Sequence, residues 1–398
     1  VGGTTNTEGA IEGYQIMVED MGEEAALELM REHAKRFFLT QMEVGLYENP
    51  YISTENATAN AWSDEHMELG TKSQEASIVM IKNSGNTIHA YDETAEKATV
   101  YIPYKYVSES TVSFPNGAAG APEITVTYSW EPCVDIEVYS QYYNVVTDSV
   151  GDPTGEDGSY TEDDVIRASG EEIASCDYAI VAMSNPVVDS TVDEDGIYYP
   201  ASIQYEEYTA DTAHEAIANG VEIVEISDGY YGTTTQEVKE DRSYTGATAE
   251  LPDTYVDYEL LQYVSGAVSE ECKVIVAMAM NSVGCMVWSE VEPLADAIVM
   301  YYNGMSGVYT DESIANIIAG KTEPSALLPM QQPASMEAVE AQQEDVPRDV
   351  ECYVDSDGNT YDFAFGLNWS GVIDDERVQT YSAEPLTTPE TITFSYAE

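Results

Sequence analysis

Three uninterrupted apolar runs dominate the hydrophobic pattern of this sequence. They cover residues 178–183, 274–280 and 297–302, and none contains a charged side chain. Each is much shorter than the roughly 20 residues that cross a bilayer, and short runs of this kind are typical of strands buried on both faces. We therefore expect three neighbouring central strands in a mostly parallel sheet sandwiched by helices, which is an α/β fold. Ligands usually bind in the loops at the carboxyl ends of such strands.

Amphipathic spacing predicts the helices. The clearest helix spans residues 23–44, where apolar side chains recur on one face and Gly45 supplies a stop. A second helix is expected from Ser63 or Asp64 towards Ile81. Further helices are expected at residues 162–174, at residues 251–268, and from Asp311 or Ser313 to Ile318.

The remaining segments are β-rich or polar. Residues 100–102 and 124–128 have the composition of strands, and residues 221–226 alternate as a half-exposed strand does. The acidic, glycine-rich stretch 147–165 is expected to be an exposed excursion. Further polar segments are expected to form a loop at 185–211, an arm at 330–349, a last ordered stretch at 354–369 and a tail at 383–398.

The charge of the chain restricts its partners. Asp and Glu number 74 against 14 Lys and Arg, which gives a formal net charge of −60. Nucleic acid and anionic membranes are excluded as partners, because their phosphates would be repelled. Such a charge favours solubility and suggests a salty or extracellular habitat.

Cysteine and histidine positions argue against a metal site. The five cysteines lack the close Cys/His pairs of a zinc site, so buried structural thiols are expected, with one disulfide as the alternative. No catalytic or metal role is expected for the four histidines, and no cofactor is expected. The chain has no recognisable signal peptide and begins without Met, which suggests a processed or excised part of a longer protein. The cysteines are Cys133, Cys176, Cys272, Cys285 and Cys352, and the histidines are His33, His66, His89 and His214.

Six motifs occur in order along most of the chain. They are F-F-L through V-G-L-Y-E-N-P-Y (37–51), E-A-S-I-V-M-I-K-N (75–83), D-Y-A-I-V-A (177–182), E-P-L-A-D-A-I (292–298), G-K-T-E-P-S-A-L-L-P (320–329) and D-G-N-T-Y through F-A-F-G-L (357–367). Together they resemble the C-terminal half of family 3 glycoside hydrolases, the β-glucosidase group. The resemblance implies a domain order: residues 1–50 as the C-terminal remnant of a TIM-like barrel, 51–98 as a linker and leading helix, 99–330 as an α/β sandwich, and 331–398 as a C-terminal arm and tail.

The resemblance also implies a reaction. The family cleaves glycosides with retention, using an Asp nucleophile on the barrel and a Glu acid/base from the sandwich domain. The nucleophile's S-D-W motif does not occur before Tyr51, and Ser63-Asp64 follows Trp62 instead of preceding it. This chain therefore carries at most half of the catalytic pair. The barrel is a separate chain, or it was removed, or the reaction was abandoned.

The implied acid/base lies near residue 240. The family pattern E-G-x-D-R, ahead of L-P-x-x-Q, corresponds to the stretch from Glu237 to Arg242, followed by Leu251-Pro252. Glu237 is the candidate acid/base and Glu240 the weaker alternative, while Asp241 and Arg242 are candidate substrate-binding residues. The upstream Glu is one residue further away than in the family and the glycine is missing, so ordinary solvated carboxylates remain the alternative. The rare cation Lys239 is expected to be structural, whereas Arg242 fits a sugar contact and charge neutralisation equally.

Aromatic residues add candidate sugar contacts. Trp62, Trp130, Trp288 and Trp369 have faces that suit pyranose rings, although core packing is expected for Trp288 and Trp369. Six tyrosines in polar loops fit glycan contact or a protein interface equally: Tyr198, Tyr199, Tyr205, Tyr208, Tyr230 and Tyr231. Lys82-Asn83 is expected to form a helix-end turn, with an approach to the barrel as the alternative.

Two functions follow as hypotheses. The first is the C-terminal portion of a retaining β-glycosidase, partnered by a carbohydrate substrate and by the barrel half of the same protein. The second is a non-catalytic carbohydrate-binding or scaffold protein on the same fold. An extracellular or cell-envelope location is expected, whereas sugar specificity, oligomeric state and retained activity stay open.

Overall fold

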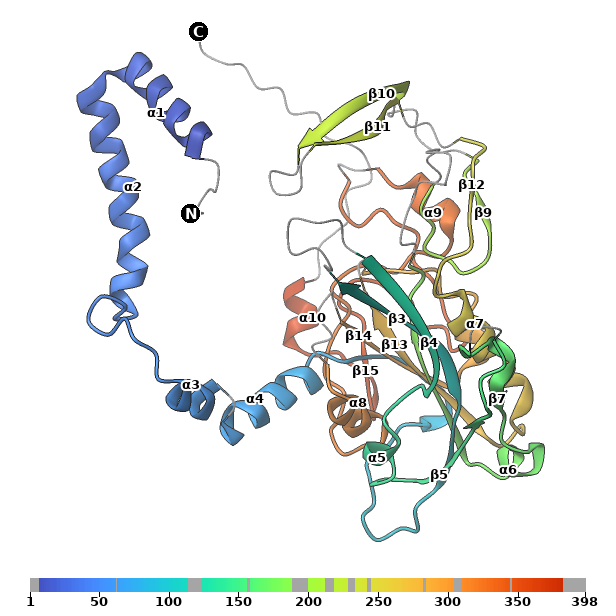
Figure 1. Cartoon of the computed structure of the whole chain (residues 1–398). Coiled ribbons are helices and arrows are strands. Elements are labelled where there is room, and N and C mark those ends of the chain that lie inside the picture. Colours follow the sequence, from blue (N-terminus) through green and yellow to red (C-terminus); the bar gives the residue numbers. More distant parts are fainter. Residues whose placement is uncertain are drawn as a thin grey trace. The chain divides into compact units, whose positions relative to one another are not determined.

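The three apolar runs are adjacent parallel strands in the computed structural model of the chain (Figure 1). They are β8 (Tyr178–Ser184), β13 (Lys273–Met280) and β14 (Ala297–Tyr302). Ile275 of β13 lies in register with Ile180 on one side and with Ala297 on the other. The prediction of neighbouring central strands is therefore confirmed.

The chain divides into two compact units, residues 1–69 and 70–398. The structure describes residues 7–61, 63–113, 123–155, 158–187, 200–211, 218–227, 233–241, 245–281, 284–303, 309–343 and 346–381.

The first unit is helical. Its helices are α1 (Thr7–Met21), α2 (Glu23–Glu43), α3 (Thr54–Ala61) and the first part of α4 (Asp64–Glu75). The helix predicted at 23–44 is confirmed as α2, and Gly45 follows it with φ 71°. On α2 the apolar side chains of Phe37, Phe38 and Met42 are 43%, 42% and 56% exposed. The helix therefore carries an apolar face that is open to solvent.

The second unit is built on a mostly parallel sheet. Its strand order is β16-β15-β1-β14-β13-β8-β2-β5. The strands not yet given are β1 (Val79–Asn83), β2 (Thr99–Ile102), β5 (Asn144–Thr147), β15 (Leu367–Asn368) and β16 (Gly371–Val372). Strands β14, β13, β8, β2 and β5 run parallel, whereas β1, β15 and β16 are antiparallel to their neighbours. Sequence order reverses between β2 and β8, because the chain passes from β2 outward to β5 and then returns to β8.

Both faces of the sheet are covered. Val181 and Val276 face a core that contains residues of α6 (Gly170–Ala174) and α7 (Tyr255–Ala267). Residues of the opposite parity, Ile180 and Ile275, face a second core with α5 (Ile136–Tyr139) and α8 (Asp311–Ile318). Full burial of each Val or Ile side chain stabilises the fold by about 1.5–3 kcal/mol. The predicted α/β sandwich is confirmed.

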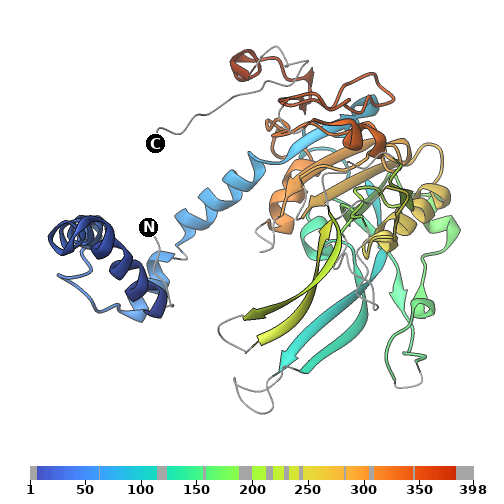
Figure 2. The same cartoon turned by 90° about the horizontal axis from the view of Figure 1, so that it is seen from above.

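Further strands pair two by two beside the sheet. The longest pairs are β3 (Tyr104–Ser113) with β4 (Glu123–Pro132), and β10 (Ala218–Ser227) with β11 (Thr233–Asp241). Figure 2 shows β3–β4 as a two-stranded arm that extends beyond the sheet. The strands predicted at 100–102, 124–128 and 221–226 lie in β2, β4 and β10. The short pairs are β6 (Ser149–Val150) with β7 (Val165–Ile166), and β9 (Tyr208–Thr209) with β12 (Thr248–Ala249).

Two predicted helices are wrong in extent. Helix α4 ends at Glu75, and residues 79–83 form β1, because Ile78 to Ile81 are fully buried and β1 pairs with β14. Lys82 therefore lies in a buried strand and not in a helix-end turn. The helix predicted at 162–174 is instead the 3-10 turn η2 (Glu162–Asp164), β7 and α6.

Side-chain hydrogen bonds account for this second error. Thr161 and Asp164 form one capping box, and Ser169 and Glu172 form another that begins α6. The exposed excursion expected at 147–165 is also wrong at two positions, because Asp148 and Asp164 are both 4% exposed. The helix predicted at 251–268 is α7, and the helix at 311–318 is α8, whose cap is Thr310.

The C-terminal arm is folded on itself. Gln332 N donates to Tyr361 O at 3.0 Å, and Tyr353 N donates to Gln332 O at 2.9 Å. The arm also holds α9 (Met336–Ala341), and α10 (Glu376–Tyr381) follows it. A further 3-10 turn, η3 (Glu292–Leu294), lies before β14.

Candidate functional site

The topology directs attention to one edge of the sheet. The five parallel strands end on the same side of the sheet, at Ile102, Thr147, Ser184, Met280 and Tyr302. In open α/β sheets ligands bind outside the carboxyl ends of strands, at the point where strand order reverses. Here that point lies between the ends of β2 and β8.

A buried carboxylate fixes the segments beside β2. The side chain of Asp148 has 0% exposure. Its Oδ1 accepts from Tyr101 Oη at 2.8 Å and from Ala168 N at 2.9 Å, and its Oδ2 accepts from Tyr104 N at 2.9 Å. Arg167 Nη1 donates to the same Oδ2 at 2.7 Å and to Tyr104 O at 2.8 Å. Arg167 is therefore held in one orientation at this edge.

A second buried carboxylate lies at the end of β8. Asp257 of α7 is 8% exposed at its side chain, and its Oδ2 accepts from Ser184 N at 2.8 Å. Lys105 Nζ lies 3.9 Å from Asp257 Oδ1. Burial raises the pKa of Asp257 and outweighs the opposing effects of Lys105 and the Ser184 hydrogen bond. A perturbed carboxyl at a carboxyl edge is a functional candidate, but this one also anchors the strand end.

A pH-dependent stability is expected from Asp257. Because its folded pKa lies above the usual 3.8, its contribution is favourable at low pH and is lost as pH rises through the folded pKa. Asp257→Asn keeps an acceptor for Ser184 N and has no charge to bury. The melting temperature of the variant relative to the wild type should therefore rise between about pH 4 and about pH 8.

Asp375→Asn is the control for this prediction. Asp375 is exposed, and hydrogen bonds from Arg377 lower its pKa, so any dependence on pH should be small and of opposite sign. A constant difference between Asp257→Asn and the wild type across the pH range would contradict the expectation.

The start of the loop after β8 is fixed by hydrogen bonds between side chains and main-chain atoms. Asn185 is fully buried, and its Oδ1 accepts from Asn281 N at 2.8 Å. Thr254 Oγ1 donates to Asn185 O at 3.0 Å, and Tyr205 Oη donates to Ser184 O. The end of β8 is thus tied to the end of β13 and to the segment before α7.

The predicted acid/base stretch lies in the hairpin between β8 and α7. Glu237, Glu240 and Asp241 belong to β11, and Arg242 lies outside the described residues. This strand pairs with β10 in antiparallel register. Glu237 is in register with Ile223, and Asp241 with Ala218.

The other aromatic and histidine candidates fall into three groups. Trp288 is buried and donates from Nε1 to Gln332 Oε1 at 2.9 Å, which confirms core packing, whereas Trp369 is half-buried. Tyr205 and Tyr208 are buried, so the expectation of glycan or interface contact is wrong for both. Trp62, Tyr198, Tyr199, Tyr230, Tyr231 and His214 lie outside the described residues.

The residues that the structure describes contain no group of three His, Cys, Asp or Glu placed to hold a metal ion. His66 Nδ1 lies 2.7 Å from Asn60 O, and His89 Nδ1 lies 3.3 Å from Thr87 O. In the same described ranges, no helix has the length and apolar character needed to cross a membrane. All five cysteines are free thiols, and three of them are buried: Cys133, Cys176 and Cys272.

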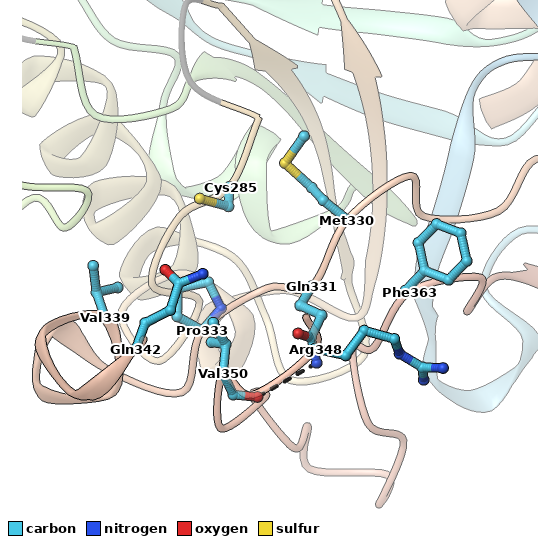
Figure 3. Close-up of a pocket in the computed structure, with 9 residues that line it drawn as sticks. All are labelled: Cys285, Met330, Gln331, Pro333, Val339, Gln342, Arg348, Val350 and Phe363. Atoms are coloured by element: carbon cyan, nitrogen blue, oxygen red, sulfur yellow. Dashed lines mark hydrogen bonds between the residues drawn. The ribbon is translucent and has the colours of Figure 1, made fainter. Parts of the chain in front are cut away.

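A hollow in the C-terminal arm has few polar groups that could bind a ligand. It has a volume of about 450 Å³ and is lined mainly by apolar side chains such as Met330, Val339 and Phe363 (Figure 3). Its polar members bind within the arm: Gln331 Nε2 donates to Asp362 Oδ1 at 2.9 Å, and Arg348 Nη2 donates to Asp362 Oδ2 at 2.8 Å. This hollow is best explained by packing of the arm.

The edge described above belongs to an α/β sandwich whose reversing strand order marks a ligand-binding crevice. The model of the glycosyl hydrolase family 3 C-terminal domain matches residues 53–369. The chain therefore belongs to the family of glycoside hydrolase family 3 C-terminal domains.

The solved structures that the chain matches include β-glucosidases. The β-glucosidase EmGH1 from Erythrobacter marinus is 17% identical, with a TM-score of 0.43 over 89% of this chain and 42% of that chain. The β-glucosidase from Listeria innocua in complex with isofagomine is 14% identical, with a TM-score of 0.45 over 89% of this chain and 41% of that chain. The chain spans about two fifths of the length of these enzymes. A search of curated protein sequences finds no significant match.

Proposed function

We propose that this chain is the C-terminal portion of a retaining β-glycosidase of the β-glucosidase kind, and that Glu237 is its acid/base. The family match over residues 53–369 carries the proposal. The order of elements supports it, because Glu237 belongs to the segment between β8 and α7, and strand order reverses next to β8. In this reaction a protonated carboxyl first donates to the leaving oxygen and then, once ionised, takes a proton from water.

The nucleophile is proposed to lie on a barrel domain outside this chain. Retaining cleavage requires two carboxyl groups about 5–5.5 Å apart, one ionised and one protonated. The barrel, on the same or a separate polypeptide, would supply the ionised carboxyl and much of the sugar contact. Asp241 and Arg242 are proposed to bind hydroxyls of the substrate.

The exposed apolar face of α2 supports a partner of this kind. Phe37, Phe38 and Met42 lie on one side of that helix, and each is more than two fifths exposed. An amphipathic helix normally buries such a face against another element. A barrel domain is the partner that the family relationship supports.

The isolated 398-residue chain is expected to show no turnover of aryl β-glucosides. Half of a catalytic pair cannot form the glycosyl-enzyme, so release of the aryl group should stay at the buffer rate. A protein that joins the barrel half to this chain should be active under the same conditions. Turnover by the isolated chain would overturn the proposal, and intact mass of the natural protein would show whether a barrel polypeptide accompanies this one.

A non-catalytic carbohydrate-binding or scaffold protein is the second candidate. The departure from the family pattern favours it, since Val238 and Lys239 occupy positions near the missing glycine. It predicts sugar binding without turnover even when the barrel half is present. An extracellular or cell-envelope location is proposed for either function, and a full gene product without an export signal would count against it.

A further inference from the structure

A pocket of about 230 Å³ lies between the base of the β3–β4 arm and the outer side of α7. Sequence reasoning singled out Trp130 as a possible sugar contact but did not bring the other lining residues together. We call it the Arg167 pocket, and its principal lining residues are Tyr104, Lys105, Tyr106, Trp130, Arg167 and Tyr263.

The aromatic walls of the Arg167 pocket are fixed by their polar ends. Trp130 Nε1 donates to Thr161 O at 2.8 Å, and Tyr106 Oη donates to Tyr160 O at 2.7 Å. The centroids of these two rings are 5.3 Å apart, with an angle of 46° between their planes. Their polar atoms are therefore occupied by the protein, and their faces are held in a constant orientation.

Arg167 crosses between two aromatic rings. Its Cζ lies 5.3 Å from the centroid of Trp130 and 4.9 Å from that of Tyr263. Both of its hydrogen bonds within the described residues leave from Nη1, to Asp148 and to Tyr104. Nε and Nη2 are thus available as donors, and the Arg167 side chain is 26% exposed.

Lys105 supplies a second donor. Its Nζ is 3.9 Å from Asp257 Oδ1, beyond hydrogen-bond distance, and its side chain is 27% exposed. Lys105 and Arg167 are the only Lys or Arg residues between Lys97 and Lys239. Two cations from one long cation-poor stretch therefore line the same pocket.

The charges around the Arg167 pocket nevertheless favour a neutral ligand. Asp148 and Asp257 lie beside the two cations, exposed Glu259 lines the mouth, and the whole chain carries −60. An anion would gain little from compensated cations and would be repelled by the chain. Fixed aromatic faces combined with several N–H donors suit a ligand with C–H faces and hydroxyl acceptors.

We propose that the Arg167 pocket binds one pyranose ring of a neutral glycan. Its volume is below the roughly 300 Å³ of sites for drug-sized ligands, so it has room for one ring and not for an oligosaccharide. The glycan would continue along β4, where Tyr128 stacks on Tyr106 with centroids 5.3 Å apart and is 45% exposed. The inference deepens the proposed function, since it gives this domain a sugar-binding site that does not use Glu237.

Binding to the isolated 398-residue chain tests the proposal. The probes are methyl β-D-glucopyranoside, cellotriose and sodium D-glucuronate, followed by saturation-transfer NMR and calorimetry. The two neutral probes should bind, with saturation strongest at their ring C–H protons. No binding of either neutral probe, or binding of glucuronate alone, would overturn the proposal.

Tyr263 offers the sharpest variants because it is 38% exposed and its replacement should leave the core intact. Tyr263→Phe should keep binding, whereas Tyr263→Leu, which keeps bulk without a ring, should weaken it by about tenfold. Tyr91→Ala is the matched control, since Tyr91 also has a cation nearby, with Lys321 Nζ 5.2 Å from its ring centroid. Equal affinities for the Phe and Leu variants, or an equal loss in the Tyr91 control, would refute the site. These measurements need no turnover, so they are independent of whether Glu237 is the acid/base.

Discussion

Replacement of Glu237 by Gln, in a protein that also carries the barrel, should slow both steps of glycoside cleavage by about 10²–10⁴-fold for alkyl glycosides. Gln cannot donate a proton to the leaving oxygen or accept one from water. The loss should be smaller for aryl glycosides with acidic leaving groups, which need less protonation to depart. Steady-state kinetics over a series of leaving groups would measure this difference.

Azide gives the decisive readout for Glu237→Gln. A small anion can attack the glycosyl-enzyme without a general base, so azide should accelerate the second step and yield a glycosyl azide. Glu240→Gln is the matched control, because Glu240 is the weaker candidate acid/base and belongs to the same strand, β11. If Glu237→Gln loses the same rate on all substrates and azide does not restore it, Glu237 is not the acid/base. If Glu240→Gln instead shows the leaving-group dependence and the azide rescue, Glu240 is the acid/base.

Long apolar runs were the most informative part of the sequence. Val276 and Ile298 are surrounded by apolar neighbours on both sides in sequence and are fully buried in the sheet. Seven consecutive apolar residues do not fit a helix with one exposed face, and a run this short and rich in Val and Ile is typical of a strand covered on both faces. The order of the strands also needed the crossover rule, which restricts how parallel strands connect.

The secondary structure of the short elements depends on strand pairing and on side-chain caps, which local composition does not reveal. Residues 78–81 continue the spacing of α4, but pairing of β1 with β14 and burial in both cores make them a strand. Likewise Thr161 and Ser169 interrupt the stretch that has helical composition, because their side chains cap separate turns. Local propensity is a weak guide wherever tertiary pairing competes with it.

Of the two proposed sites, one could be located from the sequence and the other only from the structure. Glu237 and its neighbours were found through a family pattern, and that pattern says nothing of the hairpin that carries them. The Arg167 pocket has no linear motif, since Lys105 lies in β3 and Arg167 follows β7. The two segments are joined through Asp148, which accepts from both Tyr104 N and Arg167 Nη1. The available signals were Trp130, as a candidate sugar contact, and the scarcity of cations on either side of Arg167.

Lys82→Met should destabilise the second unit by about 3–5 kcal/mol, a large part of the 5–15 kcal/mol typical of domains. Lys82 is 4% exposed, and its Nζ forms an ion pair with Glu292 and donates to Glu292 O at 2.9 Å. Glu292 also accepts from Ser356 Oγ at 2.7 Å and from Tyr353 Oη at 2.9 Å. The variant would leave a buried carboxylate without its cation, at the point where β1, η3 and the C-terminal arm meet. Urea unfolding would measure the loss.

Two further variants separate the ion pair from simple loss of a lysine. Lys321→Met should cost at most about 1 kcal/mol, since the pair between Lys321 and Glu93 is 38% and 76% exposed. Lys82→Met combined with Glu292→Leu should be more stable than Lys82→Met alone, because no unpaired charge stays buried. If Lys82→Met does not fold, Tyr353→Phe removes one hydrogen bond to Glu292 and should cost about 1.5–3 kcal/mol.

The pH dependence of Lys82→Met should identify the buried charge as the cause. Burial opposes ionisation of Glu292, but hydrogen bonds from Lys82, Ser356 and Tyr353 lower its pKa below the usual 4.5. In the wild type this stabilisation is present above pH 4.5 and is lost as pH falls through the folded pKa. Without Lys82, burial should raise the pKa of Glu292. Protonation of Glu292 then removes the unpaired buried charge of the variant and makes the variant more stable, whereas in the wild type it breaks the ion pair and lowers stability. The stability gap should therefore narrow from about pH 7 to about pH 4. A gap that stays constant over this range, or a Lys321→Met variant that loses as much stability, would show that the buried ion pair is not what ties the arm to the sheet.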